Sequence, residues 1–143
     1  QESDTVLVLP GTYKETVRFK GKNIVVTSNF ILSQDSTVIP KTVIDGNKNG
    51  GVVLFEEGES ASAVLNGFTV TNGSEGGIIC RNKARPTLMN LIVSGNSAEY
   101  NGGGIDLSSA SSPIIKNVKI TDNRTQASGG GIHLIGGASP YLD

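Results

Sequence analysis

Apolar residues in the second half of the chain alternate with polar ones instead of recurring at intervals of three and four. Ile105 and Leu107 flank Asp106, and Val118 and Ile120 flank a lysine. A period of two is typical of β-strands, in which successive side chains point to opposite faces. Clusters of Gly, Ser, Pro and Asn bound these segments and favour turns. The pattern therefore predicts strands of about three to five residues.

One phrase of this pattern is repeated. Residues 102–113 read GGGIDLSSASSP and residues 129–140 read GGGIHLIGGASP, a shift of twenty-seven positions that also aligns Asn96 with Asn123. A fixed period of about 20 to 50 residues marks a repeat protein, in which each unit buries its apolar face only against its neighbours. No helix fits inside a unit, so a leucine-rich horseshoe or a helical array is disfavoured. Three short strands and three turns per unit describe one coil of a parallel β-helix.

The alternating pattern extends over residues 1–143, although the earlier units are not spaced by exactly twenty-seven residues. We interpret the whole stretch as one domain of about five coils. Residues 51–143 hold the regular coils. Within residues 51–73, the spacing is expected to turn five apolar side chains inward: Val52, Leu54, Leu65, Phe68 and Val70.

Residues 1–50 are interpreted as the N-terminal coil, which takes in Ile24 and Val26 as its last apolar positions. Residues 29–41 match nothing in the later units, so we expect an insertion at a turn. Asp143 falls in the middle of a coil, and no residues before Val6 would cover the apolar end of the first coil. The solenoid is therefore expected to be truncated at both ends. The alternative is that coils of neighbouring molecules stack end to end, because uncovered β edges invite pairing.

Charge and composition narrow the possible partners. The 12 Lys and Arg residues nearly balance the 13 Asp and Glu residues, so no basic excess favours nucleic acid. No apolar run approaches the roughly 20 residues that span a bilayer. The single cysteine, Cys80, cannot form an internal disulfide, and its alignment with Leu107 places it inward as a small apolar residue.

Several stretches resemble a known superfamily. The opening DTVLVLPGTYKETVRFKGKNIVV, the TVIDGN step, the GFTVTNG strand and the GGGI runs resemble the right-handed parallel β-helix proteins of the pectate-lyase-like superfamily. The glycine runs and the apolar-x-x-Asn steps are also similar to the repeats of polymorphic outer-membrane proteins and related bacterial surface proteins, although the aromatic residue of that family's Phe-x-x-Asn step is replaced here. The resemblance implies an all-β, right-handed fold and an extracellular or cell-surface location. It implies no single activity, because the superfamily includes lyases, glycoside hydrolases and adhesins.

Residues 45–56, DGNKNGGVVLFE, match the calcium-loop pattern D-x-[DN]-x-[DN]-G-x5-E. The last ligand of that pattern, Glu56, would lie at the far end of an extended strand, so at most Asp45, Asn47 and Asn49 remain as a partial calcium site. The alternative is a polar turn between coils, rich in residues that tolerate positive φ.

Asp106 and His133 occupy equivalent outward positions on adjacent coils, where a carboxylate could orient an imidazole for catalysis. The third member of this column is Ile79, so the pair is equally consistent with a solvated cross-strand contact. The lyases of the superfamily use an acidic calcium cluster with a nearby basic residue, and neither that nor a cluster of aspartates is evident in the sequence.

Four further residues are predicted to lie on the outer surface and to be available to a ligand: Arg81, Lys116, Lys119 and Tyr141. Asn96 and Asn123 are expected to stack as an amide ladder at a turn, which is a structural role.

Two classes of function follow from these observations. The first is a non-catalytic secreted or cell-surface module that binds carbohydrate or another protein or acts as a spacer, with no cofactor. The second is a polysaccharide-active enzyme, for which we expect a calcium-assisted lyase on acidic glycans.

Overall fold

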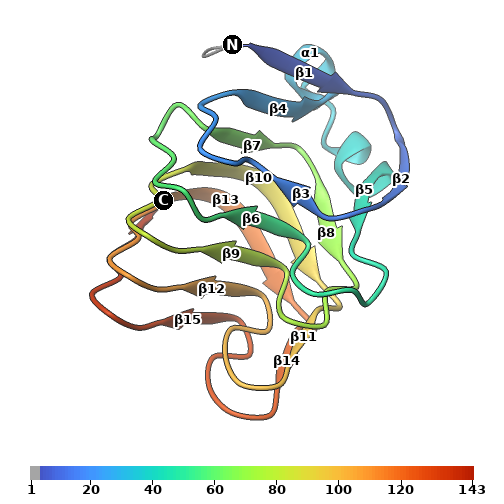
Figure 1. Cartoon of the computed structure of the whole chain (residues 1–143). Helices are drawn as coiled ribbons and strands as arrows, with labels where there is room; N and C mark the ends of the chain where they lie inside the picture. Colours follow the sequence, from blue (N-terminus) through green and yellow to red (C-terminus); the bar gives the residue numbers. More distant parts are fainter. Residues whose placement is uncertain (1–3) are drawn as a thin grey trace.

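The computed structural model describes residues 4–143, which form a parallel β-solenoid of about five turns with three sheets (Figure 1). The first strands of successive coils are β1 (Thr5–Val8), β4 (Val25–Ser28), β7 (Val64–Asn66), the start of β10 (Thr87–Ser94), the start of β13 (Ile114–Thr121) and β16 (Tyr141–Leu142). The second strands are β2 (Gly11–Lys14), β5 (Thr42–Asp45), β8 (Thr69–Thr71) and the ends of β10 and β13. The third strands are β3 (Val17–Arg18), β6 (Val53–Phe55), β9 (Ile78–Cys80), β12 (Ile105–Leu107) and β15 (Ile132–Leu134). The predicted all-β solenoid with three strands per coil is confirmed.

The register of the strands reproduces the sequence repeat. Ile105 pairs with Ile78 on one side and with Ile132 on the other, in parallel. β10 and β13 pair along most of their length, and β16 continues the stack. Earlier coils pair at other spacings because their turns differ in length. The period of twenty-seven residues therefore describes only the last coils.

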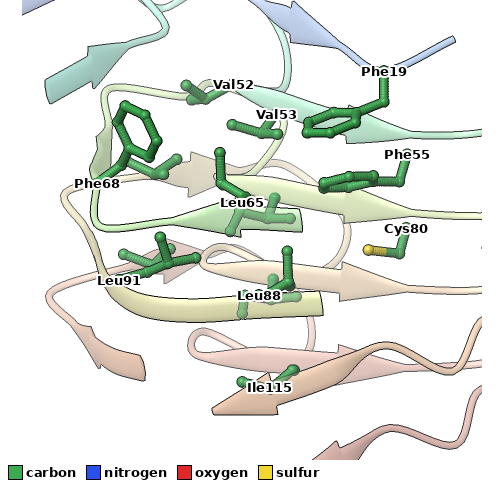
Figure 2. Packing of buried hydrophobic residues seen from close by; sticks show 14 of the residues in the cluster. Phe19, Val52, Val53, Phe55, Leu65, Phe68, Cys80, Leu88, Leu91 and Ile115 are labelled. Atoms are coloured by element: carbon green, nitrogen blue, oxygen red, sulfur yellow. The ribbon is translucent and has the colours of Figure 1, made fainter. Parts of the chain in front are cut away.

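The core lies inside the solenoid and is built from columns of like residues. Figure 2 shows Phe19, Phe55 and Cys80 above one another, with the two rings 4.2 Å apart between centroids. A second column places Leu88 between Leu65 and Ile115. Cys80 is fully buried in this cluster, which confirms its predicted inward position.

Two details of the predicted core are wrong. Leu54 lies outside the core cluster, and Phe55 takes the inward place instead, because Leu54 is in register with Ile79 on the outer side of the third sheet. Leu54 is nevertheless buried. Ile24 and Val26 belong to the second coil, since β4 pairs directly with β1.

Residues 29–41 form the predicted insertion, between the first and second strands of the second coil. They contain a short helix, α1 (Phe30–Ser33), and a 3-10 helix, η1 (Ser36–Lys41), which begins where the Asp35 side chain accepts the Thr37 N–H. Ile39 is buried and its carbonyl accepts the Thr69 hydroxyl. The insertion is thereby fastened to the outer face of the second sheet.

Two ladders of asparagine side chains fasten the coils to one another. The predicted ladder is confirmed, because Asn96 Nδ2 donates to Asn123 Oδ1 at 3.0 Å. A second ladder runs along the bend between the first two sheets, where the amide of Asn117 donates to Asn90 and that of Asn90 to Asn66, each at 2.8 Å. Asn90 and Asn117 adopt left-handed backbone conformations with φ of 53° and 50°, which asparagine tolerates better than most residues.

The glycine runs repeat because the backbones of successive coils approach closely just before the third strand. A Cβ on Gly77 would lie 2.7 Å from the carbonyl oxygen of Gly104, and one on Gly104 would lie 2.5 Å from that of Gly131. These distances are too short for any side chain, so the repeated phrase encodes the stacking of the coils.

Candidate functional site

Two long turns project from the solenoid between its second and third strands (Figure 1). They span residues 95–104 and 122–131, whereas the corresponding turn of the coil before them spans only residues 72–77. The long turns support each other, since β11 (Ser97–Ala98) pairs with β14 (Arg124–Thr125) and Asn101 bridges to Ser128. A step therefore forms where the short turn meets the first long one.

A hollow of about 430 Å³ lies at this step. Its lining combines three carboxylates, a guanidinium group, an amide and an exposed aromatic ring: Ser74, Glu75, Arg81, Ala98, Glu99, Tyr100, Asn101 and Asp106. A second hollow of similar size adjoins it and shares Ser74, Ala98 and Glu99. We call the first of these the turn hollow.

The structure brings Asp106 and His133 into direct contact beside the turn hollow. They pair in register, and His133 Nδ1 lies 2.8 Å from Asp106 Oδ1. Because a carboxylate oxygen accepts hydrogen bonds, Nδ1 carries the proton of this contact and Nε2 is the ring nitrogen that does not take part in it. Asp106 also pairs with Ile79 on its other side, as the repeat predicts.

This contact is more buried than the sequence suggests. The side chains of His133 and Asp106 are only 12% and 16% exposed. The cause is the glycine run, because a Cβ on Gly102 would lie 2.5 Å from the Cβ of Asp106, and one on Gly129 would lie 2.6 Å from that of His133. The backbones of the long turns therefore cover Asp106 and His133. The contact across the strands is partly buried, and the expectation of a solvated contact was wrong.

Arg81 reaches the turn hollow from the end of β9 and is held there by Glu56. Arg81 Nη1 lies 3.8 Å from one carboxylate oxygen of Glu56, and Arg18 Nη1 lies 2.9 Å from the other. Glu56 thus links three successive coils. The sequence analysis expected Glu56 not to join Asp45, Asn47 and Asn49 in a calcium site, and the Glu56 carboxylate instead contacts two arginines.

Asp45 ends β5, and Asn47 and Asn49 lie on the turn between β5 and β6, so this polar turn joins strands of one coil and does not lie between coils. Asp45 Oδ1 accepts the Asn47 N–H at 2.8 Å, and Asn47 and Lys48 both have positive φ. The turn adjoins the turn hollow, since the Gly50 N–H donates to Ser74 Oγ at 3.0 Å. Among residues 4–143, no three His, Cys, Asp or Glu side chains gather in a way that would hold a metal ion.

The other predicted surface residues do not gather at one site. Lys116 and Tyr141 lie on the outer face of the first sheet, where Tyr141 pairs in register with Ile114. The ammonium group of Lys116 lies 2.9 Å from Asp143, whose hydrogen bond and charge raise the pKa of the lysine. Lys119 lies on the second sheet beside the insertion.

Sequence reasoning missed Glu75, Glu99 and Tyr100, which carry much of the chemistry of the turn hollow. Aromatic residues are scarce in the chain, and the Tyr100 residue is 69% exposed to solvent. The available signal was the turn itself: residues 98–101 read AEYN where the next unit reads TQAS. A long turn whose composition departs from the repeat is a common place for function on a rigid scaffold.

Comparison with known families agrees with this architecture. Residues 13–142 match the family model described as "Right handed beta helix region". No curated protein and no solved structure matches the chain. In the part of the chain that the structure describes, neither helix is long or apolar enough to cross a membrane. Because the family match covers nearly the whole sequence, the chain belongs to the right-handed β-helix family.

Proposed function

We propose that this chain is a glycan-binding β-helix module of a secreted or cell-surface protein and that the turn hollow is its binding site. The observation that carries the proposal is the position of Tyr100, an exposed aromatic ring beside the carboxylates of Glu75, Glu99 and Asp106 in one hollow. An aromatic ring offers an apolar face to the C–H groups of a sugar, and carboxylate and amide groups accept or donate hydrogen bonds to its hydroxyls.

The scaffold supports binding because the walls of the turn hollow are fixed. The first long turn is paired to the second by β11 and β14, and the Gln126 N–H donates to the Ala98 carbonyl. Arg81 is held by Glu56. A ligand would therefore meet a largely ordered surface, which lowers the entropic cost of binding.

Two exposed tyrosines provide a matched test. Tyr100→Ala removes the ring in the turn hollow, and Tyr141→Ala removes a ring of similar exposure, 63%, on a different face. Calorimetric titration of neutral, amino-sugar and uronate oligosaccharides should show binding to the wild type that weakens about tenfold or more in Tyr100→Ala. Tyr141→Ala should bind as the wild type does. Equal losses in the two variants, or no binding by any oligosaccharide class, would reject the proposal.

A second function is favoured by the contact between Asp106 and His133. An imidazole oriented by a carboxylate next to a polar hollow can act as a general base, and the Asp45 turn adjoins the same hollow. The corresponding activity would be a calcium-assisted lyase on acidic glycans. Incubation with a panel of uronate polysaccharides, with calcium or with chelator, would show it as ultraviolet absorbance of the unsaturated product. Absorbance that disappears in both Asp106→Asn and His133→Gln would support the enzyme, and a flat trace for the wild type would reject it for those substrates.

A further inference from the structure

A separate group of polar residues lies on the turns that follow the third strands. Lys83 and Arg85 lie on the turn after β9, and Ser112 lies on the equivalent turn of the next coil. Two hollows of about 570 Å³ and 360 Å³ flank Arg85, and both are lined by Arg85 and Ser112. We call this surface the basic edge. Lys83 and Asn82 belong to the larger hollow, and Ser60 and Ser62 to the smaller.

The basic edge carries positive charge that the described residues leave unpaired. Lys83 and Arg85 are both exposed, and neither forms an ion pair within residues 4–143. No carboxylate lines either hollow, whereas hydroxyl and amide groups do. The surface therefore offers two cations and several hydrogen-bond donors.

The acidic residues Glu57 and Glu59, on the equivalent turn of the preceding coil, are turned away from this surface. Glu59 is buried, and its two carboxylate oxygens accept the N–H groups of Gly21 at 2.9 Å and Glu57 at 3.1 Å. The side chain of Glu57 lies against the turn of the first coil, since a Cβ on Gly21 would lie 3.5 Å from Glu57 Oε2. Neither carboxylate faces the two hollows that flank Arg85.

Lys83 is held in an unfavourable backbone conformation. Its φ is 64°, in the left-handed region that disfavours residues with a Cβ. The equivalent residues of the next two coils are Ala110 with a φ of 58° and Gly137 with a φ of 78°, so this conformation belongs to the turn of each coil. The turn therefore fixes the backbone from which the Lys83 cation projects.

We infer that the basic edge is a second ligand site, which binds the carboxylate or sulfate groups of an acidic polysaccharide. Arg85 presents a planar fork of donors suited to such oxyanions, and Lys83 adds a point charge beside it. The two hollows lie side by side, and each spans the turns after β6, β9 and β12, which suits a polysaccharide chain that crosses several coils better than an isolated small anion. The site is distinct from the turn hollow, whose lining is rich in carboxylates, so the inference does not depend on the proposed function.

The test uses variants that remove charge without disturbing the turn. Lys83→Asn retains a residue that tolerates positive φ, and Arg85→Gln keeps a long polar side chain. The matched control is Lys48→Asn with Lys14→Gln, because Lys48 also has a positive φ of 56° and both lysines are exposed and lie outside the basic edge. The two double variants therefore have the same net charge. Thermal unfolding of each confirms that it is folded.

Affinity electrophoresis through gels containing polygalacturonate or chondroitin sulfate measures binding, with neutral dextran as reference. The wild type should be retarded by one or both acidic polymers and not by dextran, and the double variant at Lys83 and Arg85 should bind about tenfold more weakly or worse. The control double variant should migrate as the wild type does. Unchanged retardation of the double variant, an equal loss in the control, or no retardation of the wild type would overturn the inference. Sulfate also stabilises proteins without binding to them, so its effect is compared between the wild type and the double variant at Lys83 and Arg85. A rise in thermal midpoint with sodium sulfate that is as large as that with the polymers, and that the double variant lacks, would identify a free anion as the ligand and overturn the polysaccharide assignment.

Discussion

Replacing Asn96 by alanine should destabilise the solenoid more than any change on its surface. Asn96 is buried at the start of the first long turn, and its side chain joins three coils. Its Oδ1 accepts the Gly73 N–H at 2.9 Å, and its Nδ2 donates to the Val70 carbonyl at 3.1 Å and to Asn123 Oδ1 at 3.0 Å. The substitution removes these three bonds between coils at once, together with a local bond from Nδ2 to the Ser94 carbonyl at 3.3 Å.

The expected cost follows from these bonds. Loss of Asn96 Oδ1 leaves the Gly73 N–H buried without that acceptor, which costs about 1 to 3 kcal/mol. The two bonds donated by Nδ2 contribute a net of about 0.5 to 1.5 kcal/mol each. The sum is about 4 kcal/mol, a large part of the roughly 5 to 15 kcal/mol that stabilises a typical domain.

Asn117→Gly is the matched comparison, because Asn117 ends the other ladder at an exposed position. It donates one side-chain bond to Asn90, and glycine accepts its φ of 50° without strain. This variant should lose about 1 kcal/mol. Urea unfolding followed by far-ultraviolet circular dichroism measures both values. If Asn96→Ala loses no more than Asn117→Gly, the buried ladder does not stabilise the coils in the way that its hydrogen bonds indicate.

Asn96→Asp separates the donor from the acceptor at the same position. The introduced carboxyl group keeps an acceptor for Gly73 but faces the oxygens of Val70 and Asn123, so folding raises its pKa above the ordinary value of about 3.9. Stability relative to the wild type should therefore be greatest below that value and fall as the pH rises through the folded-state pKa. A variant whose relative stability does not depend on pH would show that the donor bonds are unimportant.

Two further predictions concern buried atoms of the core. Ser111→Ala should raise the free energy of unfolding by about 1 kcal/mol, because the buried Ser111 hydroxyl has no hydrogen-bond partner among the described residues. Alanine fits this site, since the equivalent positions of the neighbouring coils are Ala84 and Ala138. A loss of stability in urea unfolding would contradict this prediction. Burial, reinforced by the charges of Glu59 and Asp106, raises the pKa of the Cys80 thiol, so iodoacetamide should label it only in denaturant, as followed by mass spectrometry. Because the folded thiol keeps a proton that the unfolded one loses above about pH 8.5, stability should also fall as the pH rises past that value, and less steeply in Cys80→Ala.

The parts of the fold that the sequence predicted are those that stacking imposes on the backbone. Glycine in the runs and asparagine in the ladder recur because close approach and side-chain bonds require those residue types. Their positions therefore predicted the coil, the register and the pairing of Asp106 with His133. The insertion was recognisable for the opposite reason, since residues 29–41 have no counterpart in the other coils.

The face of Leu54 could not be predicted because residues 52–55 are all apolar and all buried. Alternation reveals which face is inward only when the outer face is polar. Here the turn before β6 covers the outer face, as shown by Gly51, on which a Cβ would lie 2.5 Å from Ile79 Cδ1. The turn hollow was not predicted because its lining comes from turns of unequal length. Residues in such turns have no equivalent positions in an alignment of the repeats, so the alignment does not show which of them lie together.

The same comparison indicates where function lies in this solenoid. Residues that are identical across the last coils hold the coils together, as the ladder at Asn96 and the glycine runs show. Substituting them is therefore expected to change the stability of the fold. The outward-facing positions carry residues of different chemistry: Ile79, Asp106 and His133 form one such column, and Lys83 and Ala110 are neighbours in another. The scaffold does not need these side chains to close its coils. Their chemistry is therefore free to serve a ligand, and both proposed sites are built from such departures from the repeat.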